Sequence, residues 1–342
     1  MFSVVIVTKD VVGERMAGPG IRAWHFAQEL KKHFPTTLMA QGSWSRKEMR
    51  NASVLIGQPA RGFHRMRPGQ RVIYDLFDPV LLELREMYGR HPSMRQRVHF
   101  LAEQMRLRRA LSEGDLFMVA TPNQRELYAG KPIIEVGFGA ETDETDGALR
   151  ENLILWGGGT WEWLDPRTAV DAVIRLNLDG IDCRLLFLGR ARPNRALRDR
   201  RRDNRFDELV ARGDPYVIAN PEWVPYRERL SWLRRSKIAI MLHRSTPEAR
   251  YSIRTRLFDA ISTATPVIAT EEGFAAELVG REGLGIVVPP ENVAAVAGAI
   301  EKLLRDDVFY TSCVHNIERI RPRFAWPVVV TPLVEAVSRW QS

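Results

Sequence analysis

The stretch Lys237–Thr270 reads KIAIMLHRSTPEARYSIRTRLFDAISTATPVIAT and decides the fold class. Its two ends, Ile238–Leu242 and Val267–Ala269, are apolar runs of the kind found in buried parallel strands. The segment between them is dense in charged and polar side chains and has helical spacing from about Arg254. This pattern predicts a strand that delivers a charged helix N-terminus to the carboxyl edge of a sheet, where open α/β sheets bind ligands.

The charges of this segment indicate a ligand with phosphate and hydroxyl groups. Arg254 and Arg256 suit a diphosphate because a guanidinium donates parallel hydrogen bonds to phosphate oxygens. Asp259, further along the helix, suits the hydroxyls of a ribose. The alternative is a strand–loop–helix unit whose charges face water, as they usually do on a charged helix.

Size and composition limit the class of protein. The chain has 342 residues, enough for two domains, with 45% hydrophobic and 27% charged residues. The two cysteines, Cys183 and Cys313, lie far apart in no metal-type spacing, which predicts a reduced cytoplasmic protein without disulfides. The start, MFSVVIVTKD, is unlike a signal peptide, and no apolar run is long enough for a membrane span.

The net charge of +8 indicates an anionic partner. Nucleic acid, an anionic membrane surface and phosphorylated small molecules are the candidates. Much of the positive charge lies in Gly189–Arg205 and in Arg95–Arg109, and such runs are most often solvated helix faces. No nucleic-acid-binding motif accompanies them, so nucleic acid is the weaker candidate.

Strand-like runs alternate with helical patterns in both halves, which predicts two parallel, doubly wound α/β sheets. The expected strands are Ser3–Thr8, Thr36–Ala40, Ser53–Gly57, Arg71–Leu76, Leu116–Ala120 and Ile133–Val136, then Asn152–Trp156, Cys183–Gly189, Tyr216–Ala219, Ile238–Leu242, Val267–Ala269 and Gly285–Val288. The expected helices include Ile21–His33, Leu81–Met87, Met94–Leu111, one that ends at Leu176, Arg227–Arg235, Val293–Leu304 and Leu333–Trp340. Phe138–Leu149 is polar and aperiodic, as a linker between two domains would be.

Two features of the first half fit a ligand site. Met16–Gly20 is a glycine-rich turn before a helix, and Gly18 and Gly20 would let backbone N–H groups approach a phosphate; a loop that merely needs glycine fits equally well. Asp75 and Asp78 end the fourth expected strand, where a carboxylate can meet a substrate hydroxyl. Asp78 also fits a helix N-cap before a proline, and the two roles are compatible.

In the second half, Gly157–Gly159 follows directly after an apolar strand. Three consecutive glycines are costly to order, which indicates backbone packed against a ligand.

The end of the second half carries a resemblance to a known family. Thr265–Thr270 (TPVIAT), Glu272-Gly273 and Gly285–Pro289 (GIVVP) resemble the nucleotide-sugar domain of GT-B retaining glycosyltransferases, in particular the family 4 group. The resemblance is good over residues 151–307 and weaker over residues 1–139. Phe324–Trp326 is similar to the point where the last helix of that family crosses back to the first domain.

The resemblance implies a GT-B fold with two Rossmann-like domains that face each other across a cleft. Residues 1–140 would form the acceptor-side domain, with a returning C-terminal helix at 325–342, and residues 151–324 the donor domain. In the family, a Glu-x7-Glu motif precedes the TPVIAT run. Here Asp259 stands at the second glutamate, Tyr251 at the first, and Glu248 lies three residues earlier, where it can supply the carboxylate. The usual Arg/Lys pair is absent at GGGTWEW, and Arg254 and Arg256 can replace its charge.

The implied activity is a hexosyltransferase-type transfer from a UDP-, GDP- or dTDP-sugar to an acceptor hydroxyl, with retention, without metal and without a cofactor. The acceptor would be a carbohydrate, a lipid-linked or a small molecule, in polysaccharide, glycolipid or secondary-metabolite glycoside synthesis. The alternatives are glycosylation of a modified base in DNA or RNA, and a non-catalytic nucleotide-sugar binding protein. The expected location is the cytoplasm, with peripheral association at the inner membrane face as an option.

Residue roles follow from the motifs and the resemblance together. The predicted catalytic residues are Asp78, Glu248, Arg254 and Arg256, and the predicted acceptor or phosphate loop contains Gly18 and Gly20. The predicted donor-binding residues are Gly157, Gly158, Gly159, Trp161, Gly189, Val224, Tyr226, His243, Tyr251 and Asp259. For His243 a packed structural histidine is the favoured interpretation.

Overall fold

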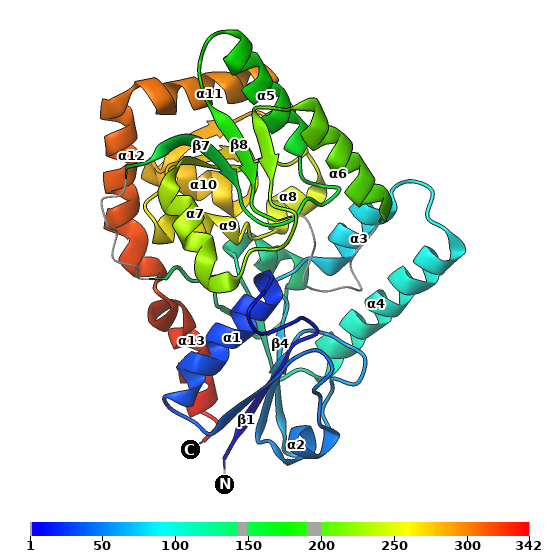
Figure 1. Cartoon of the computed structure of the whole chain (residues 1–342). Helices are drawn as coiled ribbons and strands as arrows, with labels where there is room; N and C mark the ends of the chain where they lie inside the picture. Colours follow the sequence, from blue (N-terminus) through cyan, green and yellow to red (C-terminus); the bar gives the residue numbers. More distant parts are fainter. Residues whose placement is uncertain (1, 142–148, 190–199, 342) are drawn as a thin grey trace. The chain divides into compact units, whose positions relative to one another are not determined.

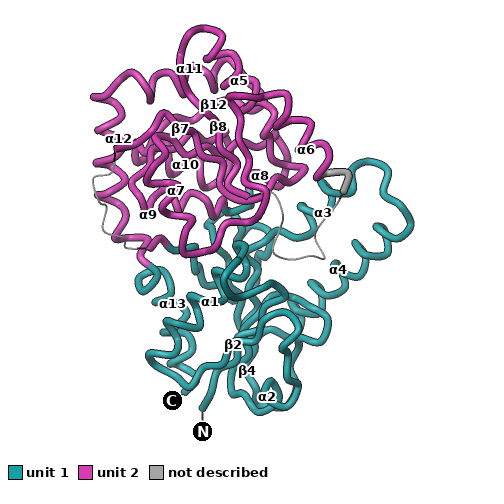
Figure 2. The backbone as a smooth tube through the Cα atoms, viewed as in Figure 1, with its two compact units in different colours: residues 1–139, 251–253, 326–342 teal, residues 140–250, 254–325 magenta. Residues whose placement is uncertain are grey.

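The computed structural model describes residues 2–141, 149–189 and 200–341, with the side chains of 200–202 excepted (Figure 1). The chain divides into two compact units (Figure 2). Unit 1 comprises residues 1–139, 251–253 and 326–342, and unit 2 comprises residues 140–250 and 254–325. Each unit is built on a parallel sheet, so the predicted α/β class with two doubly wound sheets is confirmed.

Within its described residues, unit 1 has a six-stranded sheet in the order β2-β1-β3-β4-β5-β6, with all neighbours parallel. The strands are β1 (Val4–Val7), β2 (Thr36–Met39), β3 (Val54–Gly57), β4 (Arg71–Asp75), β5 (Leu116–Val119) and β6 (Ile133–Glu135). Because β2 and β3 flank β1, the direction of winding reverses there, and the carboxyl ends of β1 and β3 frame a switch point.

The described part of unit 2 has a second six-stranded parallel sheet in the order β12-β11-β10-β7-β8-β9. Its strands are β7 (Glu151–Trp156), β8 (Arg184–Phe187), β9 (Val217–Ala219), β10 (Ser236–Met241), β11 (Val267–Thr270) and β12 (Gly285–Val288). This is the strand order of a Rossmann sheet, whose switch point lies between its first and fourth strands, here β7 and β10.

The helices of unit 1 are α1 (Gly18–Lys31), α2 (Arg46–Asn51), α3 (Val80–Tyr88), α4 (Met94–Glu113) and α13 (Trp326–Ser338), with the 3-10 turn η1 (Pro122–Tyr128). Those of unit 2 are α5 (Pro166–Leu178), α6 (Arg200–Arg212), α7 (Arg229–Arg235), α9 (Arg256–Ser262), α10 (Gly273–Glu282), α11 (Val293–Arg305) and α12 (Asp307–Ile320), with η3 (Tyr226–Glu228) and η4 (Arg321–Phe324). Helix α8 (Pro247–Tyr251) ends in the segment that clusters with unit 1. No helix in the described ranges is long and apolar enough to cross a membrane.

Several predicted boundaries are wrong. Helix α1 begins at Gly18, so Gly18 and Gly20 lie in its first turn and not in a preceding loop. Asp78 is not the N-cap of α3: Pro79 holds that position, and the Asp78 carboxylate accepts a hydrogen bond from Gln58 instead. The helix predicted from Arg254 begins two residues later, at Arg256.

Two predicted features lie largely outside the described residues. The linker Phe138–Leu149 falls mostly on 142–148, and the arginine-rich run Gly189–Arg205 falls mostly on 190–199.

A buried ion pair joins α1 to the sheet of unit 1. The Arg22 guanidinium donates to both oxygens of Asp75, at 2.8 and 3.1 Å, and to the carbonyls of Val136 and Gly137. Arg22 is 1% exposed and Asp75 8% exposed. The pair therefore ties α1, the end of β4 and the segment after β6 together, and it occupies the carboxylate of Asp75.

Close packing explains Gly20. A Cβ atom at this position would lie 2.3 Å from the carbonyl oxygen of Val11, far inside van der Waals contact. The loop after β1 therefore approaches the first turn of α1 only because residue 20 is glycine.

We predict that Asp75→Asn lowers the free energy of unfolding by about 3–5 kcal/mol, because it leaves the buried Arg22 cation without its counter-charge. Urea unfolding followed by circular dichroism measures the change. Glu301→Gln, which removes an exposed ion pair with Arg305 on α11, is the matched control and should cost less than about 1 kcal/mol. Equal losses for the two variants would contradict this role of Asp75.

We also predict opposite effects for two Gly→Ala changes. Gly20→Ala should lower the melting temperature because the Val11 carbonyl must move. Gly298→Ala, inside α11 with no atom within 4 Å of the added Cβ, should stabilise by about 0.5–1 kcal/mol. Thermal unfolding of both variants tests this, and a neutral Gly20→Ala would disprove the close-packing explanation.

Candidate functional site

The stretch Lys237–Thr270 leads to the switch point of the unit 2 sheet. Strand β10 pairs in parallel with β7, with Ile238 opposite Ile154 and Ala239 opposite Leu155. The segments that follow the two strands, Gly157–Gly159 after β7 and Leu242-His243 after β10, therefore leave the sheet from neighbouring strands at the same edge. This is the position at which a Rossmann sheet binds its ligand.

Arg256 lies against the three glycines. Its Nη2 donates to the carbonyl oxygen of Gly159 at 2.6 Å, and its guanidinium carbon lies 5.4 Å from the centroid of the Trp156 ring. Gly158 has a φ of +77°, and a Cβ atom there would lie 3.2 Å from Nε of Arg256. Glycine is thus required both by the backbone conformation and by the space that Arg256 takes.

Arg254 has a different partner. Its two Nη atoms donate to the two oxygens of Glu248, at 2.8 and 2.7 Å. The side chains are 9% and 1% exposed, so this is a buried bidentate ion pair. The structure thus brings the predicted catalytic residues Glu248 and Arg254 together, with both carboxylate oxygens of Glu248 engaged by Arg254.

Arg256 lacks such a carboxylate. Within the described part of the chain, its hydrogen-bond partner is the Gly159 carbonyl, and no Asp or Glu oxygen lies within ion-pair distance. Burial, and then repulsion from Arg254, lower the pKa of Arg256. A bound anion would relieve both effects.

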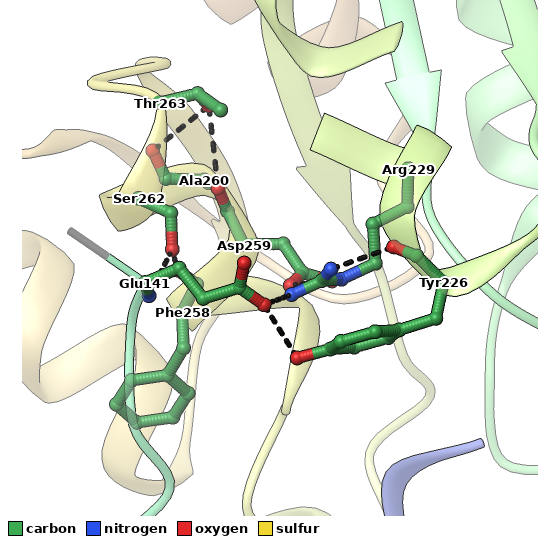
Figure 3. Close-up of polar contacts among 8 residues, drawn as sticks. All are labelled: Glu141, Tyr226, Arg229, Phe258, Asp259, Ala260, Ser262 and Thr263. Atoms are coloured by element: carbon green, nitrogen blue, oxygen red, sulfur yellow. Dashed lines mark hydrogen bonds and ion pairs between the residues drawn. The ribbon is translucent and has the colours of Figure 1, made fainter. Parts of the chain in front are cut away.

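Asp259 belongs to a polar cluster drawn in Figure 3. Its Oδ1 accepts from Nε of Arg229 at 2.9 Å, while Nη2 of Arg229 donates to Glu141 at 2.5 Å. The Arg229 guanidinium lies 3.7 Å from the centroid of the Tyr226 ring, and the Tyr226 hydroxyl donates to Glu141. Arg229 therefore connects two carboxylates and an aromatic ring.

One oxygen of Asp259 is left for a ligand. Its Oδ2 has no hydrogen-bond donor among the described residues, and the side chain is 25% exposed. Burial raises the pKa of Asp259, an effect that Arg229 opposes.

The sequence analysis missed Arg229 and Glu141. Arg229 could have been predicted as a neighbour of Tyr226, because it follows Tyr226 by three residues and so lies on the same side of a helical turn.

The other predicted donor-binding residues form two contacts. The Trp161 ring stacks on Trp163, with centroids 5.2 Å apart and planes 4° from parallel. Gly189 packs against Trp223, whose Cα would lie 3.2 Å from a Cβ at position 189, and the half-buried Val224 follows directly. Gly189 and Val224 therefore lie in adjoining segments.

His243 and Tyr251 take part in neither of these two side-chain contacts. His243 is 3% exposed, its backbone N–H donates to Oγ1 of Thr270 at 3.1 Å, and burial, with Arg254, lowers its pKa to about 4. It is thus a neutral, packed side chain near pH 7. Tyr251 ends α8, groups with unit 1, and donates to Oε2 of Glu126 at 3.3 Å.

In unit 1, Asp78 lies near the ends of several strands. Its Oδ2 accepts from Nε2 of Gln58, which follows β3, at 3.0 Å. Burial raises the pKa of Asp78 to about 7, with a further increase from Asp75 and an opposing effect of Lys9, which follows β1. Sequence reasoning did not single out Lys9 or Gln58, although both directly follow predicted strands.

The described residues hold no group of three or more His, Cys, Asp or Glu side chains placed to bind a metal ion.

One known family matches most of the second unit. Residues 151–306 match the family described as Glycosyl transferases group 1. No curated protein sequence matches the chain.

Solved structures match over the whole chain. Sucrose-phosphate synthase from Thermosynechococcus elongatus has a TM-score of 0.70 at 12% identity, covering 99% of this chain and 99% of its own. WaaG, a glycosyltransferase involved in lipopolysaccharide biosynthesis, has a TM-score of 0.70 at 12% identity, covering 99% and 100%. Anabaena HepE, solved with UDP and glucose, has a TM-score of 0.68 at 11% identity, covering 98% and 99%.

At such low identity the solved structures establish the fold alone, and the family match concerns residues 151–306. Residues 151–306 therefore match the glycosyl transferases group 1 family, and the chain as a whole has the two-domain GT-B fold.

Proposed function

We propose that unit 2 binds a nucleotide diphosphate sugar at the β7/β10 switch point and that unit 1 binds the acceptor whose hydroxyl receives the sugar. The observation that carries this proposal is Arg256, a partly buried cation that lies on three glycines and has no carboxylate partner among the described residues. An anion of high charge density is the ligand that such a position favours.

The diphosphate would contact Arg256 and the backbone of Gly157–Gly159. As the sugar leaves, negative charge develops on the diphosphate, and a fixed cation in a partly buried site stabilises it strongly. The charge of Arg254 is neutralised by Glu248, and this pair acts as a positioning element because it fixes the segment that leads to Arg256.

The nucleoside would extend toward Asp259. The Oδ2 atom of Asp259 can accept from a ribose hydroxyl while Oδ1 stays bound to Arg229. Gly189, Val224 and Tyr226 would border the base, and Trp161 would lie near the glycine segment. HepE was solved with UDP, which makes a UDP-sugar the first donor to test ahead of GDP- and dTDP-sugars.

The acceptor would be held by unit 1 near Asp78, Gln58 and Lys9, at the switch point between β1 and β3. The ionised Asp78 carboxylate would accept a hydrogen bond from the reacting hydroxyl. A sugar-containing acceptor of polysaccharide, glycolipid or secondary-metabolite synthesis fits this arrangement. Retention and metal independence follow the resemblance to the family 4 group.

We predict that Arg256→Gln weakens UDP binding about tenfold to hundredfold, because charge-assisted hydrogen bonds to phosphate are lost. Isothermal titration with UDP, and release of UDP from a panel of UDP-sugars, measure the effect. The matched control is Arg305→Gln on α11, whose exposed guanidinium pairs with Glu301. Unchanged UDP affinity in Arg256→Gln would overturn the assignment of the donor site.

A second prediction concerns Asp78. Its pKa of about 7 in the folded chain lies above the value of about 4 in an unfolded one, so between these values the folded state binds more protons. The free energy of unfolding should therefore fall as the pH rises from about 4 to about 7, and Asp78→Asn should remove this contribution. Urea unfolding across this pH range tests this prediction, and parallel curves of unfolding free energy against pH for the two proteins would contradict it.

The rate of sugar transfer should also decline below about pH 7, because the Asp78 carboxylate is then protonated.

A further inference from the structure

Four exposed apolar side chains line one face of α4 in unit 1. Met94, Val98, Leu101 and Met105 are 74%, 59%, 55% and 67% exposed. Their spacing of four, three and four residues places them on one side of the helix, here called the α4 outer face. The remaining large apolar side chains exposed in the described ranges lie on separate segments: Leu127, Leu149, Leu178, Ile218, Val308 and Val328. Single exposed residues are ordinary, whereas a continuous stripe indicates an interaction.

The fold of unit 1 does not need this stripe. The opposite side of α4 packs inward, with Ala110 buried and Leu107 and Leu111 partly buried against the hydrophobic core of the unit. Figure 1 shows α4 at the margin of unit 1, beside α3. The helix is thus held by its inner side, and the outer face is available.

Positive charge borders the stripe. At 100° per residue, Arg97 and Arg108 flank one side of it and Arg95 and Arg109 the other, and all four are exposed.

Of the two glutamates of α4, Glu103 lies on the side opposite the stripe, whereas Glu113, in the last turn, lies on the side of Arg95 and Arg109. Glu103 is 9% exposed and pairs with Arg106, and Glu113 accepts from Tyr74 and Arg109. The outer face therefore combines apolar side chains with arginines. Arg109 on one flank is paired with Glu113, and the flank of Arg97 and Arg108 carries no carboxylate of α4.

We propose that the α4 outer face docks the enzyme on an anionic lipid surface. The four apolar side chains would enter the headgroup region while the flanking arginines contact lipid phosphates, as in helices that lie in the plane of a membrane interface. A second copy of the chain is the poorer partner, because two such faces would bring rows of arginines together. The proposal concerns where the protein binds and is independent of the donor site.

The test is co-sedimentation of the whole chain with vesicles. We expect binding to vesicles of phosphatidylcholine mixed with phosphatidylglycerol, and weak binding to phosphatidylcholine alone. Val98→Asp should lower the partition coefficient at least about tenfold. Arg97→Gln/Arg108→Gln should lower it about thirtyfold at low salt, with the loss shrinking as salt is raised.

Matched controls separate docking by this face from attraction by net charge. Val308→Asp on α12 introduces the same change at a side chain that is 84% exposed. Arg167→Gln/Arg175→Gln on α5 removes the same charge from another exposed helix face. Both controls should bind like the unchanged protein, and circular dichroism should show that all variants are folded.

Three results would overturn the proposal. The first is equal vesicle binding by Val98→Asp and Val308→Asp, and the second is no preference of the unchanged protein for anionic vesicles. The third is a dimer in analytical ultracentrifugation that Val98→Asp dissociates, without vesicle binding, which would make the face an interface between copies.

Discussion

The site in unit 2 depends on the buried ion pair between Glu248 and Arg254. Each oxygen of Glu248 accepts from one Nη of Arg254, and neither side chain has more than a small exposed area. Removing one partner of such a pair leaves an uncompensated buried charge, so the segment between β10 and α9 is fixed. Helix α9 begins two residues after Arg254, and Arg256 in its first turn lies against the glycines that follow β7.

The arginines of the site differ in whether a carboxylate neutralises them, and this difference is the main chemical property of the site. Arg254 is neutralised by Glu248, and Arg229 by Glu141 and Asp259. Arg256 is left with a backbone carbonyl, in a place where burial lowers its pKa. A diphosphate would supply the missing negative charge, and the cation would then stabilise the charge that grows as the sugar leaves.

Much of the fold could be predicted from the sequence because parallel strands buried on both faces are continuous apolar runs. The strand bounds lie within two residues of those expected, and β12 is unchanged. Side-chain contacts between residues far apart in the sequence could not be predicted, because the local spacing of residues carries no signal for such contacts. Arg229 contacts Glu141 across 88 positions, and Arg256 contacts Gly159 across 97. The glycines were predicted to pack against a ligand, and in the structure Arg256 packs against them.

A crystal structure of the chain with bound UDP tests the central claim most directly. The account predicts diphosphate oxygens within hydrogen-bonding distance of the Arg256 guanidinium and the backbone of Gly157–Gly159, with a ribose hydroxyl on Oδ2 of Asp259. A diphosphate bound elsewhere, with Arg256 still donating to Gly159 alone, would contradict it.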